Sequence, residues 1–251
     1  VLAAFGIGAL AGLAALFLGP LVAYLHSLLL FRGPSGEGRA TTAPSLPEIA
    51  RYAVFAALGT GGVTYLFNAD VLLAKHFLSA DAAGIYAAGS VLGRAVYFLG
   101  LTVATVMFPE VTALHARDEA HFHVMDRSLL LLGLIAVGLV SIYTLVPRLV
   151  LLPYGSGFTG VAPYLGPFAL ALSLLAVANL LINYFLSLDS RRFVLPLLGA
   201  CVLETALIST FHGSVTQILE MLLGSMAGLC LTLAALYLAD RLRPARGGEA
   251  R

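Results

Sequence analysis

A few polar and charged side chains interrupt long apolar runs, and their types are suited to binding rather than to catalysis. The stretch LFNADVLLAK contains Asn68, Asp70 and Lys75, and the next apolar run contributes Arg94 and Tyr97. A charged side chain at the middle of a bilayer costs about 2.5–3.5 kcal/mol, so such residues usually face a bundle interior or a wet cavity. This segment is therefore the first candidate for a functional site.

The spacing of these residues leaves three interpretations open. On one continuous helix Asp70 and Lys75 are about 140° apart and do not face each other. The first interpretation is a water-filled cavity lined by Asn68, Lys75, Arg94 and Tyr97, in which Asp70 balances a cation. The second is a structural ion pair between Asp70 and Arg94. The third applies to Lys75 alone, whose long side chain would reach the membrane interface from near the helix end.

Two later apolar runs carry weaker signals of the same kind. In ANLLINYF, Asn179 and Asn183 lie four residues apart and so share one helix face. They are candidates for substrate contact, although asparagines in membrane helices also serve as interhelical hydrogen-bonding groups. Glu204 lies centrally in CVLETALIST and is expected either to be protonated and packed or to face a cavity.

No arrangement of residues in the sequence is typical of an enzyme. There is no nucleophile motif, and no glycine-rich phosphate loop of the GxxxxGK type. His115, His121 and His123 fall in a charged connector and lack the further ligands that zinc requires. A net charge of +1 gives no basic surface for nucleic acid. We therefore expect neither catalysis, nor a metal or cofactor, nor a nucleic-acid partner.

The composition indicates an all-α membrane protein. The chain is 60% hydrophobic and only 11% charged, whereas soluble domains carry about 25% charged residues. A membrane-spanning helix needs about 20 mostly apolar residues. By that rule the sequence predicts seven spans, over residues 1–30, 49–77, 82–108, 128–147, 160–187, 193–211 and 215–239. The connector RLVLLPYGSGFTG is expected to hold a short interfacial helix.

The distribution of basic residues predicts the orientation, because loops rich in arginine and lysine tend to stay in the cytoplasm. One set of connectors and the tail hold most of the arginines, whereas the opposite ends offer Arg148 and Lys75. The linker at 32–48 and the C-terminus are therefore expected to be cytoplasmic. The arginines on that side are Arg32, Arg39, Arg51, Arg117, Arg127, Arg191, Arg192, Arg241, Arg243, Arg246 and Arg251.

The segment NADVLLAKHFLSADAAGIYAAGSVLGRAVYFLGLTVATVMFPEVTAL resembles the start of the C-terminal lobe of polysaccharide-transporter proteins. These belong to the superfamily that includes the multidrug and toxin extrusion (MATE) transporters and the lipid II flippases. The resemblance implies two six-helix lobes around a central cavity. Residues 1–31 then correspond to the last helix of an N-terminal lobe and 32–48 to the cytoplasmic linker. Residues 49–240 form the C-terminal lobe and 241–251 a basic tail.

The resemblance also implies a function, a location and partners. Similar proteins move lipid-linked oligosaccharides across the cytoplasmic membrane for polysaccharide biosynthesis, with cavity cations attracting the pyrophosphate headgroup. Lys75 and Arg94 match that role by type, and the partners implied are the lipid-linked sugar, membrane lipids and an N-terminal lobe that this chain lacks. Two alternatives remain. One is the efflux of drugs or cations, with Asp70 and Glu204 carrying a proton or cation. The other is a membrane assembly subunit that does not transport anything.

Overall fold

The structure, a computed structural model, describes residues 18–19, 21–26 and 45–242. The chain divides into two compact parts, Val1–Ser45 and Leu46–Arg251. In the first part residues 18–19 and 21–26 are helical. The remainder of the predicted span at 1–30, most of the predicted linker at 32–48 and nearly all of the predicted tail at 241–251 lie outside the described residues.

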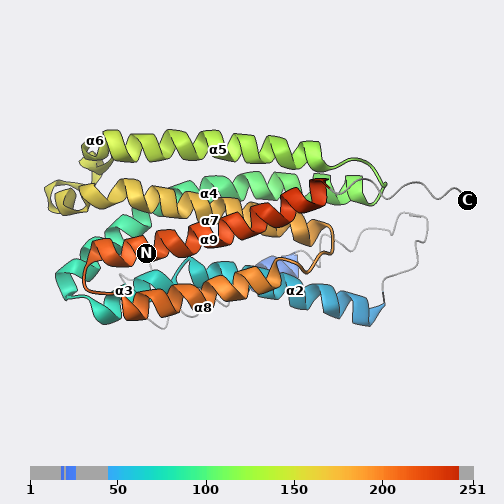
Figure 1. The fold of residues 1–251 in the computed structure, drawn as a ribbon, viewed down its shortest axis with the longest axis horizontal. Helices are drawn as coiled ribbons and strands as arrows, with labels where there is room; N and C mark the ends of the chain where they lie inside the picture. Colours follow the sequence, from blue (N-terminus) through green and yellow to red (C-terminus); the bar gives the residue numbers. More distant parts are fainter. Residues whose placement is uncertain (1–17, 20, 27–44, 243–251) are drawn as a thin grey trace, which may run out of the picture. The chain divides into compact units, whose positions relative to one another are not determined.

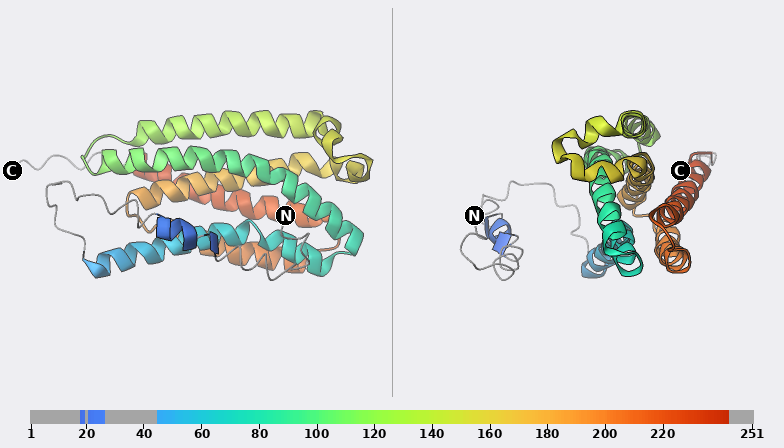
Figure 2. Two further views of the ribbon diagram at one scale, coloured as in Figure 1. Left: turned by 180° about the vertical axis from the view of Figure 1, so that it is seen from behind. Right: turned by 90° about the vertical axis from the view of Figure 1, so that its left-hand side faces the viewer.

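The described residues of the second part form helices and turns, without a strand. This arrangement suits apolar segments, because a helix satisfies its own backbone hydrogen bonds where no water is available. Figures 1 and 2 show the long helices lying side by side, with α5 and α8 at opposite edges. In chain order the elements are α2 (Leu46–Leu66), α3 (Ala69–Phe77), α4 (Ala80–His115), α5 (Phe122–Leu145), α6 (Pro147–Leu151), η2 (Leu152–Tyr154), η3 (Ser156–Val161), α7 (Ala162–Ser187), α8 (Val194–Thr210) and α9 (Val215–Leu242).

Four helical segments within the described residues are long and apolar enough to cross a membrane. They are α4, α5, the segment Gly157–Ser187 that contains α7, and α9. Helix α8 is apolar but shorter, and the predicted span at 49–77 is divided between α2 and α3. The all-helical fold is thus confirmed for the described residues, and four of the predicted spans are long and apolar enough to cross a membrane, whereas the predicted number of seven is not confirmed. The short helix expected before the fifth span is present as α6.

Helix α7 forms the centre of the second part. Of the residues in its most apolar window 78% are buried, against 17% for α5. A helix that is apolar on every side belongs in the interior. Helix α4 approaches it closely through glycines. A Cβ atom added at Gly100 would lie 2.7 Å from Ala176 Cβ, and one added at Gly89 would overlap the Phe168 ring. Small residues at such contacts let membrane helices pack tightly.

The break between α2 and α3 is the main departure from the expected helices. The sequence predicts one continuous span over 49–77, but α2 ends at Leu66 and α3 begins at Ala69. The expectation of a regular helix is wrong here because Asn68 occupies the position before α3 with a non-helical φ of −130°. The Asn68 side chain makes no capping hydrogen bond to α3 but donates to the Thr64 backbone oxygen, and Asp70 in the first turn suits the positive end of α3.

The two ends of the bundle differ in charge. At the end that holds the α4–α5 and α7–α8 connectors, three ion pairs join arginines to aspartates of other segments. Two of them involve the α7–α8 connector, namely Arg51 of α2 with Asp189 and Arg192 with Asp240 of α9, and the third joins Arg241 of α9 to Asp126 of α5. The opposite end contains Lys75 in the last turn of α3, and Arg148 in α6. The predicted basic connectors within the described part therefore gather at one end.

Candidate functional site

Arg94 lies at the break between α2 and α3. Its Nη2 donates hydrogen bonds to the backbone oxygen of Phe67 at 3.0 Å and to Asn68 Oδ1 at 3.3 Å. The guanidinium also lies over the Phe67 ring, 4.4 Å from its centroid, in a cation–π contact. Because the break leaves helix carbonyls without their usual donors, Arg94 satisfies a backbone group that lipid could not.

Asn68 completes the polar contacts at the break. Its Nδ2 donates to the backbone oxygen of Thr64 at 2.8 Å, while its Oδ1 accepts from Arg94. The side chain of Arg94 is only half-buried, and its Nε is a buried donor without a protein partner among the described residues. The guanidinium is therefore held by one edge, and part of its hydrogen-bonding capacity remains unused.

Asp70 does not form the ion pair with Arg94 that the sequence left open. None of the ion pairs between described residues joins the two. The carboxylate is 2% exposed and accepts a hydrogen bond from the Tyr86 hydroxyl at 3.0 Å. Its second oxygen, Oδ1, has no partner in the described part of the chain. Because α3 begins after a break, the positions of a continuous helix over 49–77 do not predict that Tyr86 is the partner of Asp70.

Glu204 contributes a second buried carboxyl group from α8. It is fully buried, and neither of its oxygens has a hydrogen-bond partner within the described residues. Helix α8 packs against α3, which carries Asp70. Two ionised carboxylates in a dry interior repel each other strongly. The pair therefore requires a proton, a bound cation or buried water. The sequence reasoning left Glu204 outside the candidate site, although its central place in an apolar run was the available signal.

A cavity of about 270 Å³ with mixed polar and apolar walls brings Tyr97, Asn179 and Asn183 together with Thr60 and Thr64. Asn183 Nδ2 donates to the backbone oxygen of Asn179 at 2.8 Å and to its Oδ1 at 3.2 Å. Asn179 Nδ2 is buried without a protein partner in the described structure. The cavity thus offers a free amide donor and two threonine side chains that sequence reasoning missed.

Tyr97 connects this cavity to the Arg94 group. Its ring packs against Phe67 with centroids 4.6 Å apart, and Phe67 carries Arg94 on its own ring. Asn68 connects them a second time, because the Thr64 backbone to which it donates belongs to the cavity wall. We call these residues, Thr60, Thr64, Phe67, Asn68, Arg94, Tyr97, Asn179 and Asn183, the polar site.

Lys75 lies apart from the polar site. It is exposed in the last turn of α3, and no described contact joins it to Asn68, Arg94 or Tyr97. This placement favours the interpretation in which the Lys75 side chain reaches the membrane interface over the one in which it lines the same cavity as Arg94. The cation of the polar site is therefore Arg94.

The histidine-containing connector belongs to the charged end of the bundle and does not reach the polar site. His121 Nδ1 lies 3.1 Å from the Tyr184 hydroxyl of α7. Partial burial, together with the nearby His115 and His123, lowers the pKa of His121. These contacts indicate a structural role at the junction of α5 and α7.

The chain matches no protein-family model, no curated protein and no solved structure.

Proposed function

We propose that this chain is part of a MATE-like transporter that moves a lipid-linked oligosaccharide across the cytoplasmic membrane by alternating access. The observation that supports it most directly is the half-buried guanidinium of Arg94, held at a helix break beside a cavity of amides and hydroxyls. Guanidinium groups bind phosphate oxygens through paired N–H donors. A pyrophosphate headgroup is an anion of the required kind, and amide groups are suited to sugar hydroxyls.

In this proposal the chain contributes seven spans. The broken pair α2 and α3 crosses the membrane once, and α8 crosses as a short helix. Residues 49–240 form the C-terminal six-helix lobe, residues 1–31 the last helix of the other lobe, and 32–48 the linker. Discontinuous helices near the bilayer midplane are frequent at transporter binding sites, where unwound backbone lines a cavity. The break at Phe67 and Asn68 supports the same assignment.

The orientation follows from the basic end of the bundle. The end with Arg117, Arg127 and Arg191 faces the cytoplasm, and so does the C-terminus. The headgroup contacts Arg94 while the lipid tails remain in the bilayer. The exposed Lys75 supplies a second cation nearer the outer end of α3. The substrate cavity is completed by the N-terminal lobe.

A second candidate function is the efflux of drugs or cations within the same superfamily. It is favoured by one observation, the buried carboxyl groups of Asp70 and Glu204, which have three oxygens without partners in the described structure. Such groups are suited to carrying a proton or a metal cation. The guanidinium of Arg94 disfavours a cationic drug in the adjoining cavity, because like charges repel.

The test is transport by the complete protein that contains this chain, reconstituted in lipid vesicles. A fluorescent polyprenyl pyrophosphate sugar in the outer leaflet is expected to become protected from a membrane-impermeant quencher faster than in protein-free vesicles. A fluorescent drug cation loaded inside the same vesicles serves as the control. If the drug cation were released and the lipid-linked sugar did not move, the flippase proposal would be wrong and the efflux function would be supported.

A further inference from the structure

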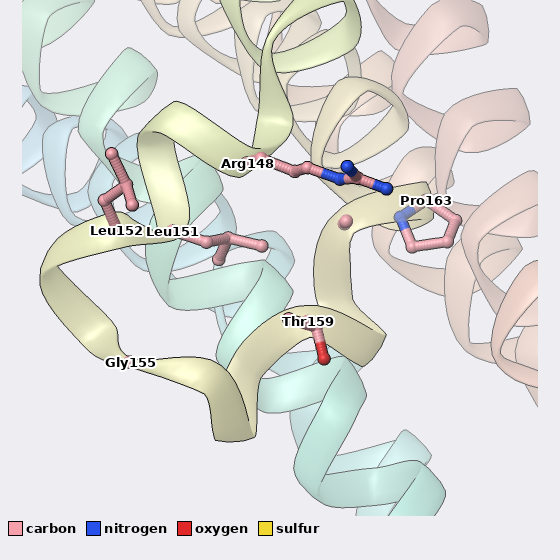
Figure 3. Close-up of a pocket in the computed structure, with 7 residues that line it drawn as sticks. Arg148, Leu151, Leu152, Gly155, Thr159 and Pro163 are labelled. Atoms are coloured by element: carbon pink, nitrogen blue, oxygen red, sulfur yellow. The ribbon is translucent and has the colours of Figure 1, made fainter.

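A second cavity lies at the opposite end of the molecule from the basic connectors, in the turn between α5 and α7. It measures about 520 Å³. Its walls come from α6, η3 and the start of α7. Figure 3 shows the guanidinium of Arg148 extending across one side toward Pro163, with Leu151 beside the hollow and Thr159 on the far wall. The cavity therefore combines one cation with mostly apolar walls.

Within the described residues no carboxylate pairs with Arg148. It is exposed, and no hydrogen bond or ion pair joins it to any other residue that the structure describes. By contrast, Arg51, Arg192 and Arg241 at the other end are each paired with an aspartate. An unpaired guanidinium above an apolar cavity attracts an anion that has an apolar part.

The position of the turn restricts the source of that anion. Helix α6 directly follows α5, which is apolar and long enough to cross the membrane, so the turn lies at the membrane interface. Leu152 is 71% exposed and Tyr154 is 51% exposed. The same turn borders an apolar groove of about 330 Å³, lined by Val91 and Leu92 of α4 with Tyr154 and Phe158. Tyrosines are enriched at this depth, where headgroups meet acyl chains.

We propose that the Arg148 cavity binds one anionic phospholipid of the surrounding bilayer. The guanidinium of Arg148 holds the phosphate through charge-assisted hydrogen bonds, and Leu151, Ala162 and Pro163 contact the glycerol and the first methylene groups. A small free anion would satisfy the guanidinium but would leave the apolar walls empty. This site is separate from the polar site, and it requires only that α5 and α7 lie in a membrane.

The test uses the purified protein in nanodiscs of phosphatidylcholine that contain about one-fifth phosphatidylglycerol as the anionic lipid. Native mass spectrometry is expected to show one phosphatidylglycerol retained in preference to phosphatidylcholine. The substitution Arg148→Gln should weaken that retention about tenfold, the effect expected from losing one charge-assisted phosphate contact. Because Arg148 is exposed and unpaired, the unfolding midpoint should not change.

Arg117→Gln is the matched control, since Arg117 is also exposed but lies in the α4–α5 connector. Ala162→Leu keeps the guanidinium, reduces the cavity and should also weaken retention. Unchanged retention in both Arg148→Gln and Ala162→Leu would overturn the proposal, and so would an equal loss in Arg117→Gln. Competition by glycerol 1-phosphate at the affinity of the lipid would assign the site to small anions and would overturn it as well.

Discussion

Arg94→Ala is expected to abolish transport of the lipid-linked sugar. The substitution removes the only cation in the polar site, and it leaves the Phe67 carbonyl without the donor that lies 3.0 Å away. An unsatisfied buried acceptor costs about 1–3 kcal/mol, so the free energy of unfolding should also fall. Transport is measured in vesicles, and stability by thermal unfolding in detergent.

Arg94→Lys separates the two effects. The lysine keeps the positive charge but lacks the planar pair of donors that contacts phosphate oxygens in parallel. We expect expression and folding closer to those of the original chain, with transport still strongly reduced. Arg117→Ala, at an exposed position of the α4–α5 connector, should leave both quantities unchanged. Normal transport by Arg94→Ala would show that this guanidinium does not contact the headgroup.

In the efflux alternative, in which Asp70 and Glu204 carry the proton or cation, Glu204→Gln is expected to eliminate the dependence of transport on an imposed cation or proton gradient. The amide has nearly the same shape as the carboxyl group, but it neither ionises nor carries a proton. Glu204 is fully buried and has no hydrogen-bond partner within the described residues, so the substitution removes no protein contact that the structure records. Stability should therefore be maintained, since a neutral amide of the same size no longer repels the charge of the nearby Asp70.

The gradient experiment compares vesicles with a sodium gradient, with a proton gradient and with neither. Glu220→Gln is the matched control, because Glu220 lies exposed near the start of α9 and away from Asp70. If Glu204→Gln retained the full response to a gradient, Glu204 would be a packed, protonated residue without a role in coupling. Asp70→Asn should act in the same direction, but it also weakens the hydrogen bond from Tyr86.

The sequence predicts a helix correctly where a long apolar run alone is enough to indicate it. Runs of about 20 apolar residues correspond to α4, α5, α7 and α9, because lipid requires every backbone group to be satisfied within the segment. The break at Asn68 shows where this reasoning failed. The letters FNAD carry a helix-start signal, an asparagine before the helix and an aspartate in its first turn, but the surrounding apolar run conceals it.

The candidate site could be predicted only in part, since spacing along a helix identifies a face and not its partner. The interval of four residues correctly placed Asn179 and Asn183 side by side. It could not reveal that Tyr97 and two threonines line the same cavity, nor that Tyr86 donates to Asp70. Those contacts depend on how α4 packs against α3 and α7, which involves the close approach at Gly89 and Gly100. A continuous helix over 49–77 would place Lys75 on the face of Asn68 and so beside Arg94, and the break between α2 and α3 removes that basis.

The polar site is expected to border water. The most direct test is the reaction of a cysteine introduced there with a charged, membrane-impermeant thiol reagent. Both native cysteines, Cys201 and Cys230, are first replaced by alanine. Thr64→Cys in the cavity wall is then compared with Leu134→Cys, which is exposed halfway along α5. The thiolate is the nucleophile that attacks the reagent, and it forms only where the thiol contacts water. We expect Thr64→Cys to react rapidly and the lipid-linked sugar to slow that reaction, while Leu134→Cys stays unlabelled. Equal resistance of both cysteines in the folded protein would contradict the claim.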